Sequence, residues 1–273
     1  MSQIDSWLDA AMLQSQFARR VPAASNYSIE CVDSIPSTNA KLLTDADHAH
    51  GRFLIARQQT AGVGRRGRNW QSPPSGNLYL SFCFHTARPL PDIALMPLAL
   101  GVEIAQCIEV EMGIELAIKW PNDLYLEGRK CGGILLETKS LANDITGIVM
   151  GVGVNVANNP SETALGRPTA CLQQASGATV ILADAALAIM TAIAHVVERP
   201  ENEVATRLQM QWPARDFLLN RHVSVTQGSG TTAVCSDGIA RGIAPDGGLR
   251  LERGGKTATL YAGEVTLGHV NGT

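Results

Sequence analysis

The chain lacks clustered cysteines and histidines. Its six cysteines stand singly among 273 residues and form no C-x-x-C pair. Its six histidines show no H-x-x-x-H or mixed His/Cys spacing of the kind that holds zinc. Dispersed thiols in a chain of this length are typical of free cysteines in a reducing compartment. We therefore expect a cytoplasmic protein with no structural metal site.

The chain also lacks a targeting segment and an excess of positive charge. Asp5 and Asp9 interrupt the apolar residues near the N-terminus, so we expect neither a signal peptide nor a membrane span. A net charge of −3 argues against general nucleic-acid binding. About thirty residues precede the first expected strand, whereas a DNA-reading helix-turn-helix domain needs roughly 50–60. We expect no DNA and no membrane among the partners.

Familiar catalytic motifs are missing as well. The sequence contains no G-x-S-x-G nucleophile elbow, no Walker A loop and no pair of carboxylates marked out by spacing. What it offers is arginines, lysines and backbone N–H groups beside glycines. Such groups suit the stabilisation of charge at a phosphorus centre better than covalent attack by the protein.

The most distinctive stretch is a loop between Ala56 and Trp70 that contains the sequence GVGRRGR. Its glycines, at 62, 64 and 67, leave the backbone free to adopt positive φ and to approach a ligand closely. Its arginines, at 65, 66 and 68, add fixed positive charge. The loop therefore suits a phosphate or another anion.

Residues 62–67 also match the dinucleotide fingerprint G-x-G-x-x-G. That interpretation requires a helix that begins inside the motif and faces the pyrophosphate. Pro73 and Pro74 follow instead, and the expected acidic residue is missing from the next strand. We reject a Rossmann fold on this context.

Hydrophobic periodicity places strands and helices along the chain. We expect an α+β fold with a mixed, largely antiparallel sheet flanked by helices. Strands are expected at 29–35, 53–56, 77–85, 116–119, 123–126, 130–137 and 145–156. Helices are expected at 5–18, 37–43, 93–112, 183–198 and 201–219. Short β runs at 222–225, 232–234, 238–244, 249–251, 257–261 and 264–267 predict a small C-terminal barrel. We place the domains at 1–219 and 220–273.

Four further segments place polar or charged residues beside glycine or proline. They are Ser37-Thr38-Asn39, Lys119-Trp120-Pro121-Asn122-Asp123, Lys130-Cys131-Gly132-Gly133 and Gly151-x-Gly153-x-Asn155. Taken singly, the first suits a helix cap and each lysine a solvated surface residue. Taken together, strands with glycines and polar ends indicate the walls of one pocket.

In this order the motifs resemble those of the biotin protein ligases. The resemblance covers roughly Ser37 to Asn155 and the terminal Gly263–Leu267. It implies a class II synthetase-like catalytic domain with an SH3-like C-terminal barrel, in the form without an N-terminal DNA-binding domain. It also implies ATP-dependent activation of biotin to biotinyl-5'-AMP, with Mg²⁺, and transfer to a lysine of a biotin carboxyl carrier protein of acetyl-CoA carboxylase. Two anions must meet in this reaction, so cations and correct alignment supply most of what it requires.

The resemblance assigns roles to individual residues. For the ureido ring of biotin it implies Ser37, Thr38, Asn39 and Gln59. For the biotin carboxylate and the adenylate phosphate it implies Arg65 and the backbone of Val63 and Gly64, and Gly62, Gly132 and Gly133 are expected among the other binding residues. The implied catalytic cations are Arg65, Lys130 at phosphorus and Arg68 on the pyrophosphate. Trp70 is expected near the adenine, with Asn155 and Asp123 as weaker candidates for the nucleotide and its Mg²⁺.

One position departs from the family pattern. Val63 stands where many members carry arginine. The change is mild if this position acts through its backbone. If the side chain orders the loop over the adenylate, retention of the intermediate is weaker in this chain.

Three other interpretations remain. A lipoate or octanoate ligase or transferase of the same fold is the nearest, although the arginine-rich loop and Lys119–Asp123 argue against it. A non-catalytic biotin sensor would need a DNA-binding segment, and a structural scaffold would leave the ordered motifs unexplained. A homodimer formed through an edge strand is also possible.

Overall fold

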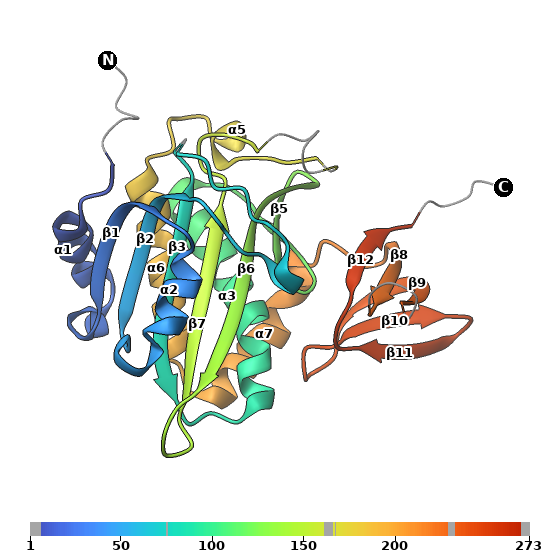
Figure 1. The fold of residues 1–273 in the computed structure, drawn as a ribbon. Helices are drawn as coiled ribbons and strands as arrows, with labels where there is room; N and C mark the ends of the chain where they lie inside the picture. Colours follow the sequence, from blue (N-terminus) through green and yellow to red (C-terminus); the bar gives the residue numbers. More distant parts are fainter. Residues whose placement is uncertain (1–6, 75, 161–165, 167, 229–232, 269–273) are drawn as a thin grey trace.

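The protein contains two β-sheets, a large one surrounded by helices and a small one at the C-terminal end (Figure 1). The structure, a computed structural model, describes residues 7–74, 76–160, 166, 168–228 and 233–268. The large sheet has the order β1-β2-β3-β7-β6-β5-β4, and only the β1–β2 pair is parallel. Its strands are β1 (Ser28–Ile35), β2 (Arg52–Gln59), β3 (Leu78–Thr86), β4 (Ala117–Lys119), β5 (Asp123–Leu126), β6 (Arg129–Ser140) and β7 (Thr146–Val154). The predicted largely antiparallel sheet is confirmed.

Helices cover both faces of this sheet. The α-helices are α1 (Ala10–Arg20), α2 (Thr38–Thr44), α3 (Leu90–Met112), α5 (Leu172–Ala175), α6 (Leu182–Glu198) and α7 (Glu201–Arg215). Short 3₁₀ segments are η2 (Pro22–Asn26), η3 (Ala46–His48) and η4 (Arg65–Gly67). Helices α3 and α6 lie behind the sheet as drawn in Figure 1, and α2 lies in front of it.

Strand β3 shows how the two faces are divided. Leu80 and Phe82 belong to the main core with α3 and α6, whereas Cys83 belongs to a smaller core under α2. Because side chains alternate along a strand, Tyr79 and Ser81 point to the α2 face. All four neighbours from Tyr79 to Phe82 are buried, so this strand shows no alternation of polar and apolar exposure. The α2 face is where the site lies.

Helix α3 is the longest helix among the described residues, with 23 residues, and is rich in apolar side chains. It is long and apolar enough to cross a membrane by length and composition, but 67% of its most apolar window is buried inside the protein. It packs against α6, α7 and the sheet. These contacts are those of a core helix.

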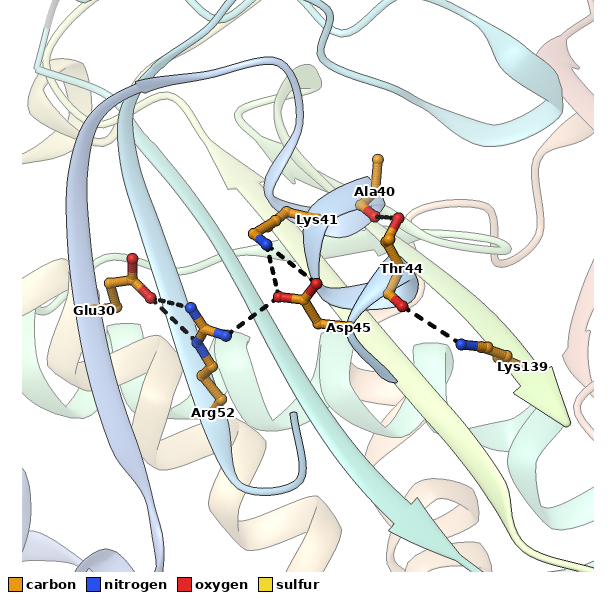
Figure 2. A network of polar contacts seen from close by, with 7 residues as sticks. All are labelled: Glu30, Ala40, Lys41, Thr44, Asp45, Arg52 and Lys139. Carbon is orange, nitrogen blue, oxygen red and sulfur yellow. Dashed lines mark hydrogen bonds and ion pairs between the residues drawn. The ribbon is translucent and has the colours of Figure 1, made fainter. Parts of the chain in front are cut away.

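A network of charged side chains fastens the C-terminal end of α2 to the sheet (Figure 2). Arg52 on β2 binds Glu30 on β1 and reaches the Asp45 carboxylate at 3.4 Å. Asp45, the C-cap of α2, also accepts from Lys41 at 2.8 Å. Lys139 on β6 donates to the Thr44 carbonyl at 3.4 Å. Because α2 has only seven residues, these contacts fix its direction and hence the position of its N-terminus.

The C-terminal sheet has the order β11-β10-β9-β8-β12 and is antiparallel throughout. Its strands are β8 (His222–Gln227), β9 (Val234–Ile243), β10 (Leu249–Arg253), β11 (Lys256–Leu260) and β12 (Glu264–Leu267). The predicted small C-terminal β unit is confirmed, as a sheet whose hydrogen-bond ladder ends at β11 and β12. It packs on α3 and α7 through a shared apolar core, and Trp120 Nε1 donates to the Gly247 carbonyl at 3.0 Å.

Several predicted boundaries were wrong. The first helix begins at Ala10, where Asp9 caps it, and residues 5 and 6 lie outside the described part. Helix α7 ends at Arg215, before the predicted 219. The predicted runs 232–234 and 238–244 form one strand, β9, with residue 232 outside the described part, and the short helix α5 was not predicted. The strands predicted at 123–126 and 130–137 pair as a hairpin, and its turn residues Glu127 and Gly128 both have positive φ.

Candidate active site

A cleft with about 1080 Å³ of space, partly open to solvent, lies between the α2 face of the large sheet and the start of β12. It is bounded by the N-terminus of α2, the glycine–arginine loop, the segment 119–123 and parts of β3, β6 and β7. Of the predicted site residues it brings together Ser37, Thr38, Asn39, Gln59, Val63, Gly64, Arg65, Arg68, Trp70, Asp123, Lys130 and Gly133. Residues far apart in the sequence thus form the walls of one pocket.

The N-terminus of α2 is both a helix cap and a wall of the cleft. Ser37 is the N-cap, and its hydroxyl accepts from the Ala40 N–H at 3.3 Å. The Thr38 N–H donates to Gln59 Oε1 at 2.8 Å. Because that N–H can only donate, it fixes the Gln59 amide with its nitrogen toward Ser72 Oγ, 3.0 Å away. The triplet therefore serves the structure and lines the site at once.

Asn39 is more fully occupied by protein partners than the sequence suggested. Its amide nitrogen donates to Glu137 Oε2 at 2.9 Å and lies 3.5 Å from the Leu135 carbonyl. Its amide oxygen accepts from the Ser81 hydroxyl at 2.5 Å. A Cβ at Gly151 would lie only 2.1 Å from that oxygen, so glycine there makes room for the side chain. Direct binding of a ligand by Asn39 remains a prediction.

The glycine–arginine loop folds back on itself. Trp70 N–H donates to the Gly62 carbonyl at 2.9 Å, and Gly64 N–H donates to the Arg68 carbonyl at 2.6 Å. Arg66 and Gly67 have positive φ, whereas Gly62 and Gly64 do not. Only one of the three glycines thus uses the backbone freedom expected from the sequence. Because the Gly64 N–H has a partner, phosphate binding through it requires the loop to change conformation.

Two arginines of this loop have quite different surroundings. Arg65 lies inside the cleft, donates to Asn122 Oδ1 at 3.0 Å, and has its pKa lowered by burial, with Asp123 acting in the opposite direction. Arg68 is half-exposed and forms a two-bond ion pair with Glu264 of β12. Arg65 is therefore placed to act on a ligand, whereas Arg68 must leave Glu264 to do so.

Lys130 is a buried cation in the wall of the cleft. Its ammonium lies 2.5 Å from Asp123 Oδ1 and 5.3 Å from the centre of the Trp70 ring. Only 9% of the residue is exposed. A carboxylate and an aromatic face together offset the cost of burying this charge. A solvated surface lysine, the simplest alternative from the sequence, is thereby excluded.

The Trp70 ring lies close to glycines of two strands. A Cβ at Gly153 would be 2.6 Å from its ring, and one at Gly133 would be 3.3 Å away. Its indole N–H is buried and has no hydrogen-bond partner among the described residues. A buried donor without a partner indicates a place where a ligand or water completes the site.

Gly153→Ala should raise the KM for ATP roughly tenfold, because the new methyl group must push the indole away from the Lys130 side of the cleft. Gly177→Ala is the control, since a Cβ there would meet nothing within 4 Å. Steady-state kinetics with varied ATP measure the change. An unaltered KM for ATP in Gly153→Ala would show that the ring position is unimportant for the nucleotide.

Three predicted residues lie outside the main cleft. Gly62 permits a close approach within the protein, since a Cβ there would be 2.5 Å from the Trp70 carbonyl oxygen. A Cβ at Gly132 would likewise be 2.9 Å from the Gly153 carbonyl oxygen. Asn155 donates to the Ala170 carbonyl at 3.0 Å and lines a smaller hollow beside Trp70 and Lys130. Its predicted contact with a nucleotide would be made from that side.

Other residues of the site were not singled out from the sequence. Ser81 faces the cleft from β3. Asn122 accepts a hydrogen bond from Arg65, and Glu264 lines the cleft from the C-terminal sheet. Asn122 lies in the segment Lys119–Asp123 and Glu264 in the terminal motif Gly263–Leu267, which were the sequence signals for these two, whereas Ser81 had none. Among the described residues, no group of three or more His, Cys, Asp or Glu side chains is arranged to hold a metal ion.

The fold and the cleft define a class of protein. A cleft on an α+β sheet combines a polar end at α2 with a buried cation at Lys130 and a partly buried one at Arg65. That arrangement suits an enzyme that activates an anionic substrate by transfer at phosphorus.

Comparison with known proteins gives the family. Residues 29–155 match the model of the biotin/lipoate A/B protein ligase family, and residues 218–268 match the biotin protein ligase C-terminal domain. The bifunctional ligase/repressor BirA of Escherichia coli is 32% identical over 241 residues, which are 88% of this chain and 74% of the relative. A biotin–[acetyl-CoA-carboxylase] ligase of Mycobacterium tuberculosis is 30% identical over 267 residues, 94% and 95% of the two chains. The chain belongs to the biotin protein ligase family.

The fold agrees with solved structures of that family. The biotin protein ligase from Aquifex aeolicus in complex with biotin and ATP superposes with a TM-score of 0.71 and 24% identity, covering 88% of this chain and 97% of that one. The fold class predicted from the sequence is confirmed.

Proposed function

We propose that this protein activates biotin with ATP and transfers it to a lysine of a biotin carboxyl carrier protein. A biotin carboxylate oxygen attacks the α-phosphorus of ATP, and the bond to the β-phosphate breaks, which releases pyrophosphate. The lysine amine then attacks the acyl carbon of biotinyl-5'-AMP, and AMP leaves. The observation that carries the proposal is the convergence, in one cleft, of a polar pocket at α2 with the buried cation Lys130 and the partly buried cation Arg65.

The α2 end of the cleft matches the hydrogen-bonding pattern of a cyclic urea. The Ser37 oxygen accepts from Ala40, so its own hydrogen is left to donate. One N–H of the Gln59 amide is used by Ser72, and the other is left to donate. Thr38 Oγ1 offers lone pairs as an acceptor. Two donors suit the urea oxygen, and an acceptor suits a urea N–H.

The opposite end of the cleft suits the acid and the phosphates. Lys130 lies where a buried positive charge can neutralise charge that develops at phosphorus. Arg65 adds a second cation for the biotin carboxylate and the adenylate. The indole of Trp70, with its unpartnered N–H, offers a flat face and a donor to the adenine. Arg68 would bind the pyrophosphate after leaving Glu264.

Magnesium fits this end of the cleft through one carboxylate. Mg²⁺ in nucleotide sites is usually held by one or two carboxylates together with substrate phosphates and water. Asp123 lines the cleft beside Lys130 and would supply that carboxylate. The ion would neutralise phosphate charge while Lys130 keeps its place against Trp70.

The remaining assignments complete the proposal. The carrier is the biotin carboxyl carrier protein of acetyl-CoA carboxylase, and the reaction takes place in the cytoplasm. Residues 1–219 form the catalytic domain and residues 220–273 the C-terminal domain, with Glu264 as the contact of the latter with the catalytic loop.

ATP–pyrophosphate exchange tests the first half-reaction. We expect the purified protein to exchange labelled pyrophosphate into ATP when biotin is present and not when it is absent. Biotin should also raise the Tm, because a ligand of the folded state stabilises by mass action. Exchange with lipoate or octanoate but not with biotin would show that the enzyme activates a different acid within the same family. If no acid supported pyrophosphate exchange, the proposed enzymatic activity would be contradicted.

A further inference from the structure

We propose that Glu137 is a positioning residue for biotin recognition, which acts by fixing the orientation of the Asn39 amide. This inference rests on the proposed function. Glu137 lies on β6, is partly buried and has the Asn39 amide nitrogen 2.9 Å from its Oε2. It is not among the residues that line the cleft, so its effect on a ligand must pass through Asn39.

The orientation of Asn39 follows from the chemistry of its neighbours. An ionised carboxylate and a main-chain carbonyl can only accept hydrogen bonds. Glu137 and the Leu135 carbonyl both face one end of the amide, so that end must be the nitrogen. The amide oxygen is therefore directed at Ser81 Oγ, 2.5 Å away. Both residues are buried, Asn39 at 4% exposure and Ser81 at 0%, so water does not relax this requirement.

The orientation of Asn39 determines that of the next two hydroxyl groups. An amide oxygen only accepts, so Ser81 must spend its single hydrogen on Asn39. Thr38 Oγ1, 2.7 Å from Ser81 Oγ and 3.1 Å from Gln59 Oε1, then has acceptors on both sides. Its hydrogen is used within the protein, and it presents lone pairs to the cleft. The acceptor that suits a urea N–H is thus set by the Glu137 carboxylate through a chain of three hydrogen bonds.

Loss of the charge at Glu137 removes this control. A glutamine can donate as well as accept, so Asn39 becomes able to turn its nitrogen toward Ser81. Ser81 then accepts from Asn39 and donates to Thr38 Oγ1, whose own hydrogen goes to Gln59 Oε1, 3.1 Å away. One Thr38 lone pair is thereby used within the protein, which weakens the acceptor that Thr38 offers to a urea N–H. We expect Glu137→Gln to raise the KM for biotin about tenfold, with kcat and the KM for ATP little changed.

A double variant separates the direction of the hydrogen bond between residues 39 and 137 from the packing of their side chains. In Asn39→Asp the new carboxylate faces Glu137, so two acceptors oppose each other and biotin binding should weaken further. In Asn39→Asp with Glu137→Gln, the glutamine nitrogen donates to the aspartate, whose other oxygen again accepts from Ser81. We expect this double variant to recover a KM for biotin within about threefold of the unaltered protein. If Glu137 had a merely structural role, moving the carboxylate to position 39 and the amide to position 137 would not restore biotin binding.

The experiment is pyrophosphate exchange with biotin and ATP varied in turn, on all four proteins and on Glu127→Gln. Glu127 is an exposed carboxylate of the same β-hairpin and serves as the matched control. A normal KM for biotin in Glu137→Gln, or a double variant no better than Asn39→Asp, would overturn the positioning role alone. Absence of biotin-dependent exchange in the unaltered protein would overturn the proposed function and this inference with it.

Discussion

Replacing Lys130 with alanine should lower kcat for biotin-dependent pyrophosphate exchange by about 10²- to 10³-fold, while the KM for biotin changes little. The expected loss is large because the ammonium acts in a part of the cleft that excludes most water. Charges interact more strongly there than at an exposed surface. In the proposed arrangement biotin lies mainly at the α2 end, away from this lysine, so we expect its ground-state affinity to change little.

The surroundings of Lys130 explain why no neighbouring cation can replace it. Asp123 and the Trp70 ring hold the ammonium in one position, and the residue is only 9% exposed. Arg68 is half-exposed and paired with Glu264 on the other unit. A preorganised charge costs no rearrangement during the reaction, whereas Arg68 must first break its ion pair.

The control for this variant is Lys256→Ala, which removes an exposed lysine on β11 and should leave the exchange rate unchanged. The alanine at 130 also leaves Asp123 without the lysine, so the Tm of both variants must be measured. A fall in exchange that merely follows a lower Tm, or a KM effect with kcat preserved, would contradict the role at phosphorus.

Much of the site was predictable because many of its residues stand in short contiguous motifs. The segments around Ser37, Arg65 and Lys130 each combine a charged or polar residue with local turn or glycine signals. Such segments lie at strand ends and loops, where the backbone must be special to serve a ligand. Ser37 and Arg65 follow the neighbouring strands β1 and β2, and Lys130 lies on β6, which pairs with β5.

The rest depends on register and on packing between elements, which no local motif records. Ser81 reaches the site only because β3 turns its odd-numbered side chains toward α2. Glu137 reaches Asn39 across sequence separations of nearly one hundred residues. Glycines 62 and 132 carried the right signal for close approach, but what approaches is another part of the chain. Sequence spacing cannot show whether such a glycine makes room for a ligand or for another part of the chain.

Glu103→Gln should lower the free energy of unfolding at pH 7 by about 3 kcal/mol. Glu103 lies on α3 with its side chain 3% exposed, and it binds Arg199 at 2.7 Å, Arg207 at 2.5 Å and His195 at 3.4 Å. The carboxylate thus joins three elements, α3, α6 and α7, around one buried charge. Its removal leaves cations that have lost their shared partner.

The contribution of Glu103 to the free energy of unfolding should depend on pH. Burial alone would raise the pKa of Glu103, but hydrogen bonds from His195, Arg199 and Arg207 outweigh it and lower the pKa from 4.5 to about 2. A lowered folded-state pKa means that the unfolded chain binds the proton more readily. The stabilisation is therefore complete above about pH 4.5 and is lost as the pH falls toward 2. Glutamine cannot titrate, so the difference between the two proteins should be largest at neutral pH and vanish near pH 2.

Urea unfolding at a series of pH values measures this difference. Glu109→Gln is the matched control on the same helix, because Glu109 pairs with Arg215 and its side chain is 39% exposed. Solvent screens that pair, so its loss should cost about 1 kcal/mol or less. Equal losses in the two variants, or a Glu103 difference that persists unchanged down to pH 2, would show that packing sustains this junction of helices. A difference confined to the range above pH 2 would instead assign the stability to one carboxylate shared by three cations.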